Sequence, residues 1–390
     1  MDAISAYIEL GLRLGRHVDG LVDAYYGPHE SAARIASETP RAPARLADDA
    51  AELRDRLTGA LDAGRARWVA AQLTGLETVA RRLAGEDIAF ADEVERCYGI
   101  RPRRVPDDVF KSAHEALDAL LPGDGPLSAR YQAWREADAL DGERLQRVVG
   151  ALGDELRIRT RAAIGLPDAE SVVFDYVRDE PWTAYNYYEG NLRSRVAVNT
   201  DLPMPANFVV ELVAHETYPG HHTEHAWKEQ RLTRERGQLE ETLLMIGTPQ
   251  SLISEGIAQV GPAVLLGDEL ESLGAEQLAR EGVHYDAALA RAIKSARRPL
   301  EDVPGNAALM LHEDGADVEA ARQYLIRWGL LAEARAGHVI KFITDPVWRS
   351  YVSTYTDGQR LVESFVDGDV ERLRRLLTEQ LSPADLLERE

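Results

Sequence analysis

The stretch from residue 211 to residue 225 constrains the fold of this chain more than any other. The sequence contains ten histidines, and four of them fall in this stretch, at the end of an apolar run that predicts a helix. Neutral imidazole and carboxylate groups are ligands that Zn²⁺ takes, and a catalytic zinc site typically has three protein ligands and an open position. The composition therefore indicates a metal site, whose ligands the fold must bring to one point.

The order of the histidines is irregular for such a site. His215 followed by Glu216 is half of the H-E-x-x-H arrangement, in which two histidines one turn apart bind the metal and the glutamate deprotonates its water. The fifth position is Pro219 here, and the next histidines are His221 and His222. On an ideal helix His215 and His221 would lie about 600° apart and point to different sides. A straight helix therefore cannot join them at one metal ion.

A break in the helix would solve this problem. Pro219 lacks a backbone donor, and its ring clashes with the carbonyl group four residues earlier, while Gly220 tolerates unusual backbone conformations. We predict that this Pro-Gly pair loops out and returns His221 to the place of an i+4 ligand. His222 remains an alternative ligand, since position i+7 lies on nearly the same face but about 10 Å along the axis.

The run HETYPGHH, residues 215–222, resembles the HExxPGHH signature of the DUF885 proteins, a family of presumed zinc metallopeptidases with a largely helical fold. Residues 100–106, 254–258 and 310–315 are similar to further segments of that family. The second of these, Ser-Glu-Gly-Ile-Ala, resembles its Glu-Gly-Trp-Ala-Leu-Tyr motif. The resemblance covers most of the chain and implies a gluzincin-like, multi-helix zinc metallopeptidase fold.

The resemblance also implies a set of site residues. In zinc peptidases with a glutamate ligand, that residue lies on a helix beside the metal helix, and Glu255 follows His215 by forty positions. His215, His221 and Glu255 would then hold zinc, and Glu216 would be the general base that takes a proton from zinc-bound water. An ordinary glutamate at a helix start, favoured by the helix dipole, is the alternative for Glu255.

The chain departs from the family pattern near these residues. Glu224 stands where the family often has glutamine, and Ile257 and Val260 replace a tryptophan and a tyrosine. These changes concern the pocket wall more than the metal, so they bear on substrate preference. Glu211 and Glu224 are the local carboxylates that could accept the second N–H of a ligating imidazole.

A zinc peptidase also needs a donor aimed at the developing oxyanion, commonly a tyrosine or histidine from elsewhere in the chain. Residues 348–358 resemble the tyrosine-containing C-terminal segment of the family. We assign this catalytic role to Tyr355, with Tyr351 and His312 as alternatives. Three arginines could bind a substrate carboxylate, namely Arg193, Arg195 and Arg360.

Composition limits the class of protein. The net charge of −21 repels phosphate backbones and anionic membrane surfaces, which argues against nucleic acid and membrane as partners. A single cysteine, Cys97, excludes an internal disulfide and suits a reducing compartment. The N-terminal residues lack the features of a signal peptide, and no window reaches the roughly 18 apolar residues of a membrane span. We therefore expect a cytoplasmic protein, with its oligomeric state left open.

Hydrophobic periodicity predicts a mainly α-helical chain with a small β element beside the metal site. Helices are expected over 3–26, 43–84 with an interruption near Gly64, 87–98, 107–120, 127–138 and 142–163. Short strands are expected over 171–177 and 194–199, with an aromatic cluster between them. Helices resume over 249–272, 275–297, 304–313, 315–329, 332–344 and 357–378.

We expect one catalytic unit over residues 1–390, with an N-terminal helical half, 1–166, and a C-terminal half, 167–390, that carries the metal site. The strand before the metal helix would suit a peptidase, because an exposed edge can pair with an extended peptide; a packing hairpin is the alternative. The expected function is hydrolysis of peptide bonds at zinc. The alternatives are a zinc hydrolase of a small non-peptide amide and a non-catalytic helical metal-binding protein.

Overall fold

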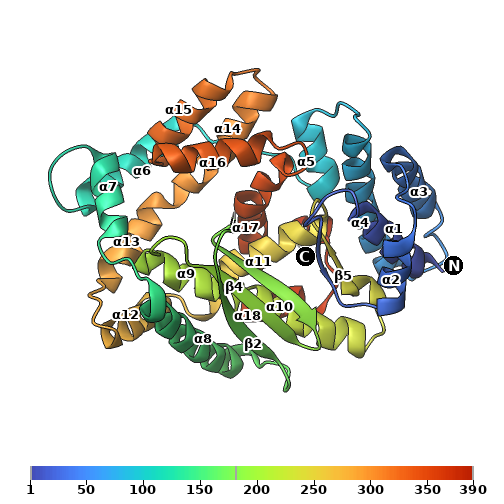
Figure 1. Cartoon of the computed structure of the whole chain (residues 1–390), viewed down its shortest axis with the longest axis horizontal. Helices are drawn as coiled ribbons and strands as arrows, with labels where there is room; N and C mark the ends of the chain where they lie inside the picture. Colours follow the sequence, from blue (N-terminus) through green and yellow to red (C-terminus); the bar gives the residue numbers. More distant parts are fainter. Residues whose placement is uncertain (1, 181, 389–390) are drawn as a thin grey trace.

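The computed structural model describes residues 2–180 and 182–388. Most of these residues lie in helices, and the few strands form two small sheets (Figure 1). The mainly α-helical fold expected from the sequence is therefore confirmed. Within the described residues, no helix has both the length and the apolar composition that crossing a membrane requires.

The first part of the chain is helical except for one strand. Its elements are α1 (Ala3–Leu14), β1 (Val22–Tyr25), α2 (His29–Ser37), α3 (Pro43–Asp55), α4 (Ala63–Leu83), α5 (Phe90–Tyr98), α6 (Asp107–Leu120), α7 (Leu127–Glu136) and α8 (Gly142–Ile164). The helix expected over 3–26 is wrong beyond Leu14. Residues 22–25 instead pair antiparallel with β5 (Leu243–Met245), far along the chain. Such long-range pairing overrides local helical periodicity.

The middle of the chain holds the larger sheet and residues 211–225, the stretch whose composition predicts a metal site. Its elements are β2 (Ser171–Val177), β3 (Ala184–Gly190), β4 (Arg193–Asn199), α9 (Ala206–Glu216), α10 (His221–Lys228), η1 (Glu229–Arg234) and η2 (Leu239–Thr242). The strand order is β2-β4-β3, with β2 parallel and β3 antiparallel to β4. Both expected strands are confirmed, and three residues of the aromatic cluster between them, Tyr185, Tyr187 and Tyr188, lie in a third strand, β3.

Helices make up the rest of the chain. They are α11 (Pro249–Leu265), α12 (Glu269–Arg280), α13 (Ala287–Arg297), η3 (Arg298–Asp302), α14 (Val303–His312), α15 (Val318–Gly329), α16 (Glu333–Thr344), η4 (Arg349–Tyr351), α17 (Val352–Val366), α18 (Val370–Thr378) and α19 (Pro383–Leu387). The expected outer boundaries at residues 249 and 297 are confirmed, but the inner ones at 272 and 275 are wrong, because Gly267 and Gly282 adopt left-handed conformations after α11 and α12. Gly368 likewise separates α17 from α18.

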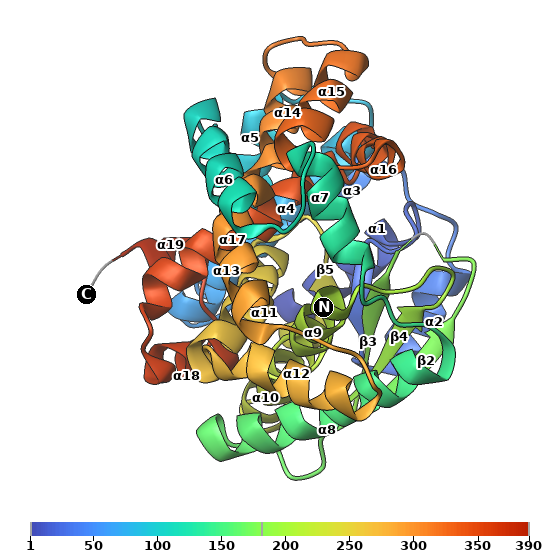
Figure 2. The same cartoon turned by 90° about the vertical axis from the view of Figure 1, so that its left-hand side faces the viewer.

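Two hydrophobic cores meet at residues 211–225. The larger core combines residues of the first helices with residues of α11, α14 and α17, from the far end of the chain. The smaller core combines α8, β4, α9 and α12. In Figures 1 and 2, α9 and α11 lie side by side near the centre of the molecule. Because α9 belongs to one core and α11 to the other, both cores fix the position of residues between them.

Candidate metal centre

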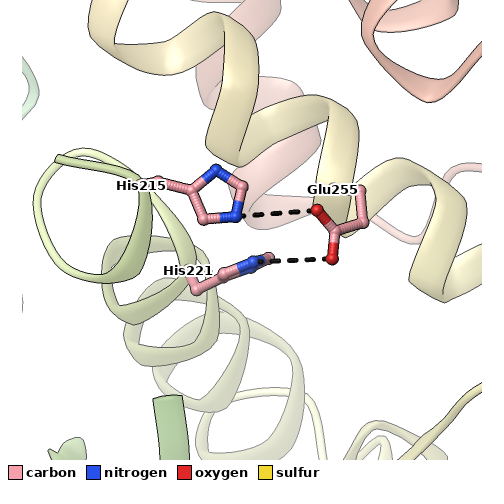
Figure 3. Close-up of side chains that lie close together, drawn as sticks. All are labelled: His215, His221 and Glu255. Carbon is pink, nitrogen blue, oxygen red and sulfur yellow. Dashed lines mark ion pairs between the residues drawn. The ribbon is translucent and has the colours of Figure 1, made fainter. Parts of the chain in front are cut away.

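Three side chains from three helices converge at this boundary. His215 comes from the last turn of α9, His221 from the start of α10 and Glu255 from α11. One ligand atom of each lies within 4.8 Å of the others. The Nε2 atom of His215 is 3.6 Å from one carboxylate oxygen of Glu255, and the Nε2 atom of His221 is 3.9 Å from the other (Figure 3). The structure thus brings together the three residues proposed as metal ligands.

The break between α9 and α10 makes this convergence possible. The first helix ends at Glu216 and the second begins at His221, so the helix breaks where the sequence predicted. A Cβ atom on Gly220 would lie 1.8 Å from the carbonyl oxygen of His215, which only glycine permits. This close approach sets the ring centroids of His215 and His221 4.6 Å apart, nearly perpendicular to each other.

His222, the alternative ligand, lies outside this cluster. Its side chain is fully buried, with Nδ1 2.8 Å from the Ser194 hydroxyl and Nε2 3.1 Å from a carboxylate oxygen of Glu170. The same Glu170 oxygen accepts a 2.5 Å hydrogen bond from Tyr218, in the loop between the two helices. His222 therefore ties the start of α10 to β4 and to the residue that precedes β2.

Hydrogen bonds hold two of the candidate ligands in place. The Nδ1 atom of His221 lies 3.2 Å from the Ser254 hydroxyl, which donates a 2.5 Å hydrogen bond to Glu224. Tyr351 donates a 2.8 Å hydrogen bond to Glu255. Glu224 thus acts on His221 through a serine. Glu211, the other carboxylate considered for this role, pairs instead with Arg297 at 2.9 Å.

The protonation of these groups follows from their burial. Desolvation lowers the pKa of His215 well below its usual value and that of His221 to about 4. Both imidazoles are therefore neutral and have a lone pair to offer. Desolvation also raises the pKa of Glu255 to about 7, to which the charges of Asp23 and Glu224 contribute.

Glu216 lies beside the three ligands but is not one of the cluster. Glu216 is 8% exposed, and its backbone carbonyl accepts a 2.6 Å hydrogen bond from Asn186 on β3. Desolvation, followed by the charges of Glu255 and Asp23, raises its pKa to about 8. A carboxyl group with this pKa can both take up and release a proton near neutrality, which a general base must do.

Asp23, which was not predicted from the sequence, lies close to the carboxyl groups of Glu216 and Glu255. It belongs to β1 and accepts a hydrogen bond from Tyr185 on β3. Its charge raises the pKa of Glu216, Glu255 and Tyr355. No local signal could have revealed it, because the residue was placed in a helix that ends at Leu14 in the structure. Only the pairing of β1 with β5 brings it to the site.

The three candidates for an oxyanion donor have different surroundings in the structure. Tyr355, on α17, is 40% exposed, and its pKa is raised by desolvation and then by the charges of Glu255 and Glu216. Tyr351 is engaged with Glu255. His312 hydrogen-bonds the carbonyl of Ile343 at 2.7 Å. Tyr355 therefore has an accessible side chain beside the candidate ligands, whereas the hydroxyl of Tyr351 already has a partner.

The donor set fits a zinc ion. One carboxylate oxygen of Glu255 is buried and has no hydrogen-bond partner among the described residues, and a buried polar atom without a partner is costly. Two neutral imidazole nitrogens face this carboxylate (Figure 3). Two histidines and one glutamate are a known ligand set of catalytic zinc, which keeps a further coordination position open. A cation would satisfy the unpaired oxygen.

Comparison with known proteins relates the fold to two bacterial structures. No family model matches the chain, and no curated protein matches it significantly. A "putative lipoprotein" from Colwellia psychrerythraea has a TM-score of 0.54 at 13% identity, over 92% of this chain and 68% of its own. A "putative lipoprotein of unknown function" from Shewanella oneidensis has a TM-score of 0.54 at 11% identity, over 99% and 82%. At these identities the likeness concerns the fold alone.

Proposed function

We propose that this protein is a zinc-dependent metallopeptidase of the type that its HExxPGHH run resembles. The observation that carries the proposal is the convergence of His215, His221 and Glu255 within 4.8 Å, beside a buried carboxyl group, Glu216, that is not a member of the cluster. A site that only stored metal would need no such neighbour. The unpartnered oxygen of Glu255 and the neutral imidazoles support zinc as the metal.

The chain's own residues account for the steps of amide hydrolysis. Zinc bound by the three ligands would polarise the substrate carbonyl and lower the pKa of water. Glu216 takes a proton from the attacking water and returns it to the leaving amine, for which a pKa near neutrality is suited. Tyr355, whose side chain is accessible next to Glu216 and Glu255, donates a hydrogen bond to the developing oxyanion.

The strand β3 supports a peptide as the substrate. It lies at the edge of the three-stranded sheet, hydrogen-bonded to β4, and Asn186 on this strand bonds the backbone of Glu216. An edge strand can pair with an extended peptide and align it. A peptide bond held along β3 would therefore have a fixed position relative to the general base.

The test combines metal analysis with peptide cleavage. Purified protein should contain about one equivalent of zinc, which His215→Ala should lose, and should cleave members of a mixed peptide library, detected by mass spectrometry. Chelation should abolish this cleavage. The Glu216→Gln variant should retain zinc but lose the activity. Full activity in that variant would contradict the proposed role of Glu216 as general base.

Two other outcomes would redirect the proposal. Stoichiometric zinc with cleavage of acyl amides but of no peptide would indicate a hydrolase of small non-peptide amides. Stoichiometric zinc without any hydrolysis would indicate a metal-binding protein. Absence of metal would contradict all three functions.

A further inference from the structure

A buried carboxylate lies behind the turn between α9 and α10. Glu170 comes just before β2, and its side chain is fully buried. One of its oxygens accepts hydrogen bonds from two guanidinium groups, at 2.7 Å from Arg157 and 2.8 Å from Arg161. These arginines lie one turn apart on α8, and both are partly exposed. Two cations at the surface therefore offset the charge of a carboxylate in the interior.

The other oxygen of Glu170 joins the two residues that flank the segment 219–221. Tyr218 donates a 2.5 Å hydrogen bond to this oxygen, and the Nε2 atom of His222 lies 3.1 Å from it. The two rings contact each other edge to face, with their centroids 5.0 Å apart. A single oxygen atom therefore holds both ends of the segment that contains the helix break and the candidate ligand His221.

The ionisation of Glu170 fixes the direction of these hydrogen bonds. Desolvation raises its pKa, but hydrogen bonds from His222, Tyr218 and Arg157 outweigh this effect and lower the pKa to about 2. Near neutral pH the carboxylate can therefore only accept, so the Nε2 atom of His222 carries a proton and donates it. The Nδ1 atom of the same ring lies 2.8 Å from the Ser194 hydroxyl. Both ring nitrogens of His222 are thus engaged.

A buried ion is a poor means of stabilising a fold. Moving a carboxylate out of water costs free energy, and apolar residues of similar volume often stabilise a protein equally well. Hydrogen bonds to a charged acceptor instead fix distances and directions. The backbone contacts of the turn are local, from Gly220 to the carbonyl of Ala214 and from Thr223 to that of Thr217. Glu170 adds an anchor from outside the turn.

We propose that Glu170 is a positioning residue of the metal centre, which holds the turn through Tyr218 and His222 so that His221 faces Glu255. This inference rests on the proposed function and concerns how its metal site is assembled. The Nε2 atom of His221 lies 3.9 Å from a carboxylate oxygen of Glu255, and a shift of the first turn of α10 would change this distance. Glu170 acts on metal affinity through the place of His221 alone.

The test removes one hydroxyl at this anchor and one at a matched position. Tyr285 donates a 2.5 Å hydrogen bond to Glu271, a buried carboxylate on α12, and both tyrosines pack on the smaller core. Urea unfolding should show a loss of stability in Tyr218→Phe and in Tyr285→Phe. Competition with a chromophoric chelator should show about tenfold weaker zinc binding in Tyr218→Phe alone. The absorption spectrum of the cobalt-substituted protein should change in that variant alone, because His221 is displaced.

Two substitutions of His222 distinguish positioning from ligation. His222→Gln keeps a side-chain N–H group that can donate to Glu170, whereas His222→Ala keeps none. The glutamine variant should therefore bind zinc about tenfold more tightly than the alanine variant, with a cobalt spectrum closer to that of the wild type. An equal loss of zinc binding in both variants would contradict the role of Glu170.

Metal binding and cleavage by the wild-type protein separate this inference from the function on which it rests. Zinc binding that Tyr218→Phe weakens, without any peptide cleavage, would overturn the peptidase and keep the role of Glu170. Cleavage by a protein whose zinc affinity and cobalt spectrum Tyr218→Phe leaves unchanged would keep the peptidase and overturn that role. Equal effects of Tyr218→Phe and Tyr285→Phe on zinc binding would also overturn it, and absence of metal from the wild type would overturn both.

Discussion

Two tyrosines one turn apart on the same stretch have different surroundings at the candidate site. Tyr351 donates to Glu255, a candidate ligand, whereas Tyr355 has an accessible side chain near Glu216. Partners that orient a ligand affect metal affinity, whereas oxyanion donors affect the rate. The pair therefore allows the two contributions to be measured separately.

Removal of each hydroxyl should give a different result. Tyr355→Phe should lower kcat by about 10²- to 10³-fold, with unchanged zinc content, since it removes an oxyanion donor. Tyr351→Phe should weaken zinc binding by about 10- to 100-fold, because Glu255 loses its hydrogen bond. Zinc titration and steady-state kinetics on both variants check this. Loss of zinc in Tyr355→Phe would show that its role is structural.

The carboxyl group of Glu216 should make the metal-free protein less stable as pH rises. Its folded pKa of about 8 lies above the ordinary value of 4.5, so the folded state binds the proton more tightly and loses stability between these two pH values. Glu216→Gln should therefore stabilise the metal-free protein at pH 8 by about 4 kcal/mol, and by much less at pH 5. Urea unfolding with chelator at both pH values measures this.

A matched variant completes that experiment. Glu276 on α12 is exposed, so Glu276→Gln should not change the pH dependence. If Glu216→Gln gave the same free energy of unfolding as the wild type at pH 8, the carboxyl group would not be desolvated in solution.

The sequence predicted the candidate ligands but not the residues that surround them. His215, Glu216 and His221 are neighbours in the chain, and the Pro-Gly pair between them has a local effect on the backbone that chemistry alone predicts. Asp23 carries no such local signal, because its place depends on strand pairing between distant segments. The same limit left both His221 and His222 open, since only the contacts of His222 with Ser194 and Glu170 decide between them.

The crossing of α11 and α17 brings Tyr351 to Glu255. A Cβ atom on Gly256 would lie 2.4 Å from the carbonyl oxygen of Gly358, and one on Gly358 would lie 2.5 Å from that of Leu252. The two backbones can approach this closely only because both positions are glycine. Gly256, in the segment 254–258 that resembles a family motif, therefore has a packing role next to the candidate ligand Glu255.

Adding one methyl group at this crossing should disturb both stability and the site. Gly256→Ala would push α17 away from α11 and should destabilise the protein by about 1–3 kcal/mol, with weaker zinc binding because Tyr351 moves from Glu255. Gly150→Ala, inside α8, has nothing within 4 Å of the added Cβ and should be neutral or stabilising by about 0.5–1 kcal/mol. Denaturant unfolding and zinc titration measure both. Equal behaviour of the two variants would contradict the tight crossing.

The errors in the expected elements have two physical causes, long-range strand pairing and left-handed glycines. Helical periodicity extended the first helix through residues that form β1, and it joined α11 to α12 across Gly267. The aromatic cluster was not predicted as a strand, and only the pairing of β3 with β4 shows that most of it forms one. Local patterns predict which segments can be helical, whereas long-range pairing and left-handed glycines decide where each element ends.

At the scale of the whole molecule, the candidate site connects segments that are far apart in the sequence. Asp23 comes from β1, Glu216 from α9 and Glu255 from α11. The charge of Asp23 raises the pKa of both glutamates, and the charge of Glu255 raises the pKa of Glu216. Without a cation, folding brings together groups that repel when ionised. A divalent ion at His215, His221 and Glu255 would offset this repulsion and would bind the folded state alone.

Zinc should therefore stabilise the whole chain against unfolding. A ligand at 100 times its dissociation constant contributes about 2.7 kcal/mol, so saturating zinc should raise the Tm by several degrees. Glu255 must lose a proton to bind the metal, and its pKa is about 7, so the rise should be larger at pH 8 than at pH 6. Both histidines are already neutral in this range, because desolvation lowers their pKa values.

Calorimetry of the chelated and zinc-supplemented protein at both pH values measures this linkage. His215→Ala should abolish the rise in Tm, whereas His284→Ala, at an exposed histidine before α13, should retain it. An equal rise in both variants would place the zinc outside the proposed centre. A rise that is independent of pH would mean that Glu255 is already ionised in the metal-free protein, so that neither burial nor the charges of Asp23 and Glu224 raise its pKa.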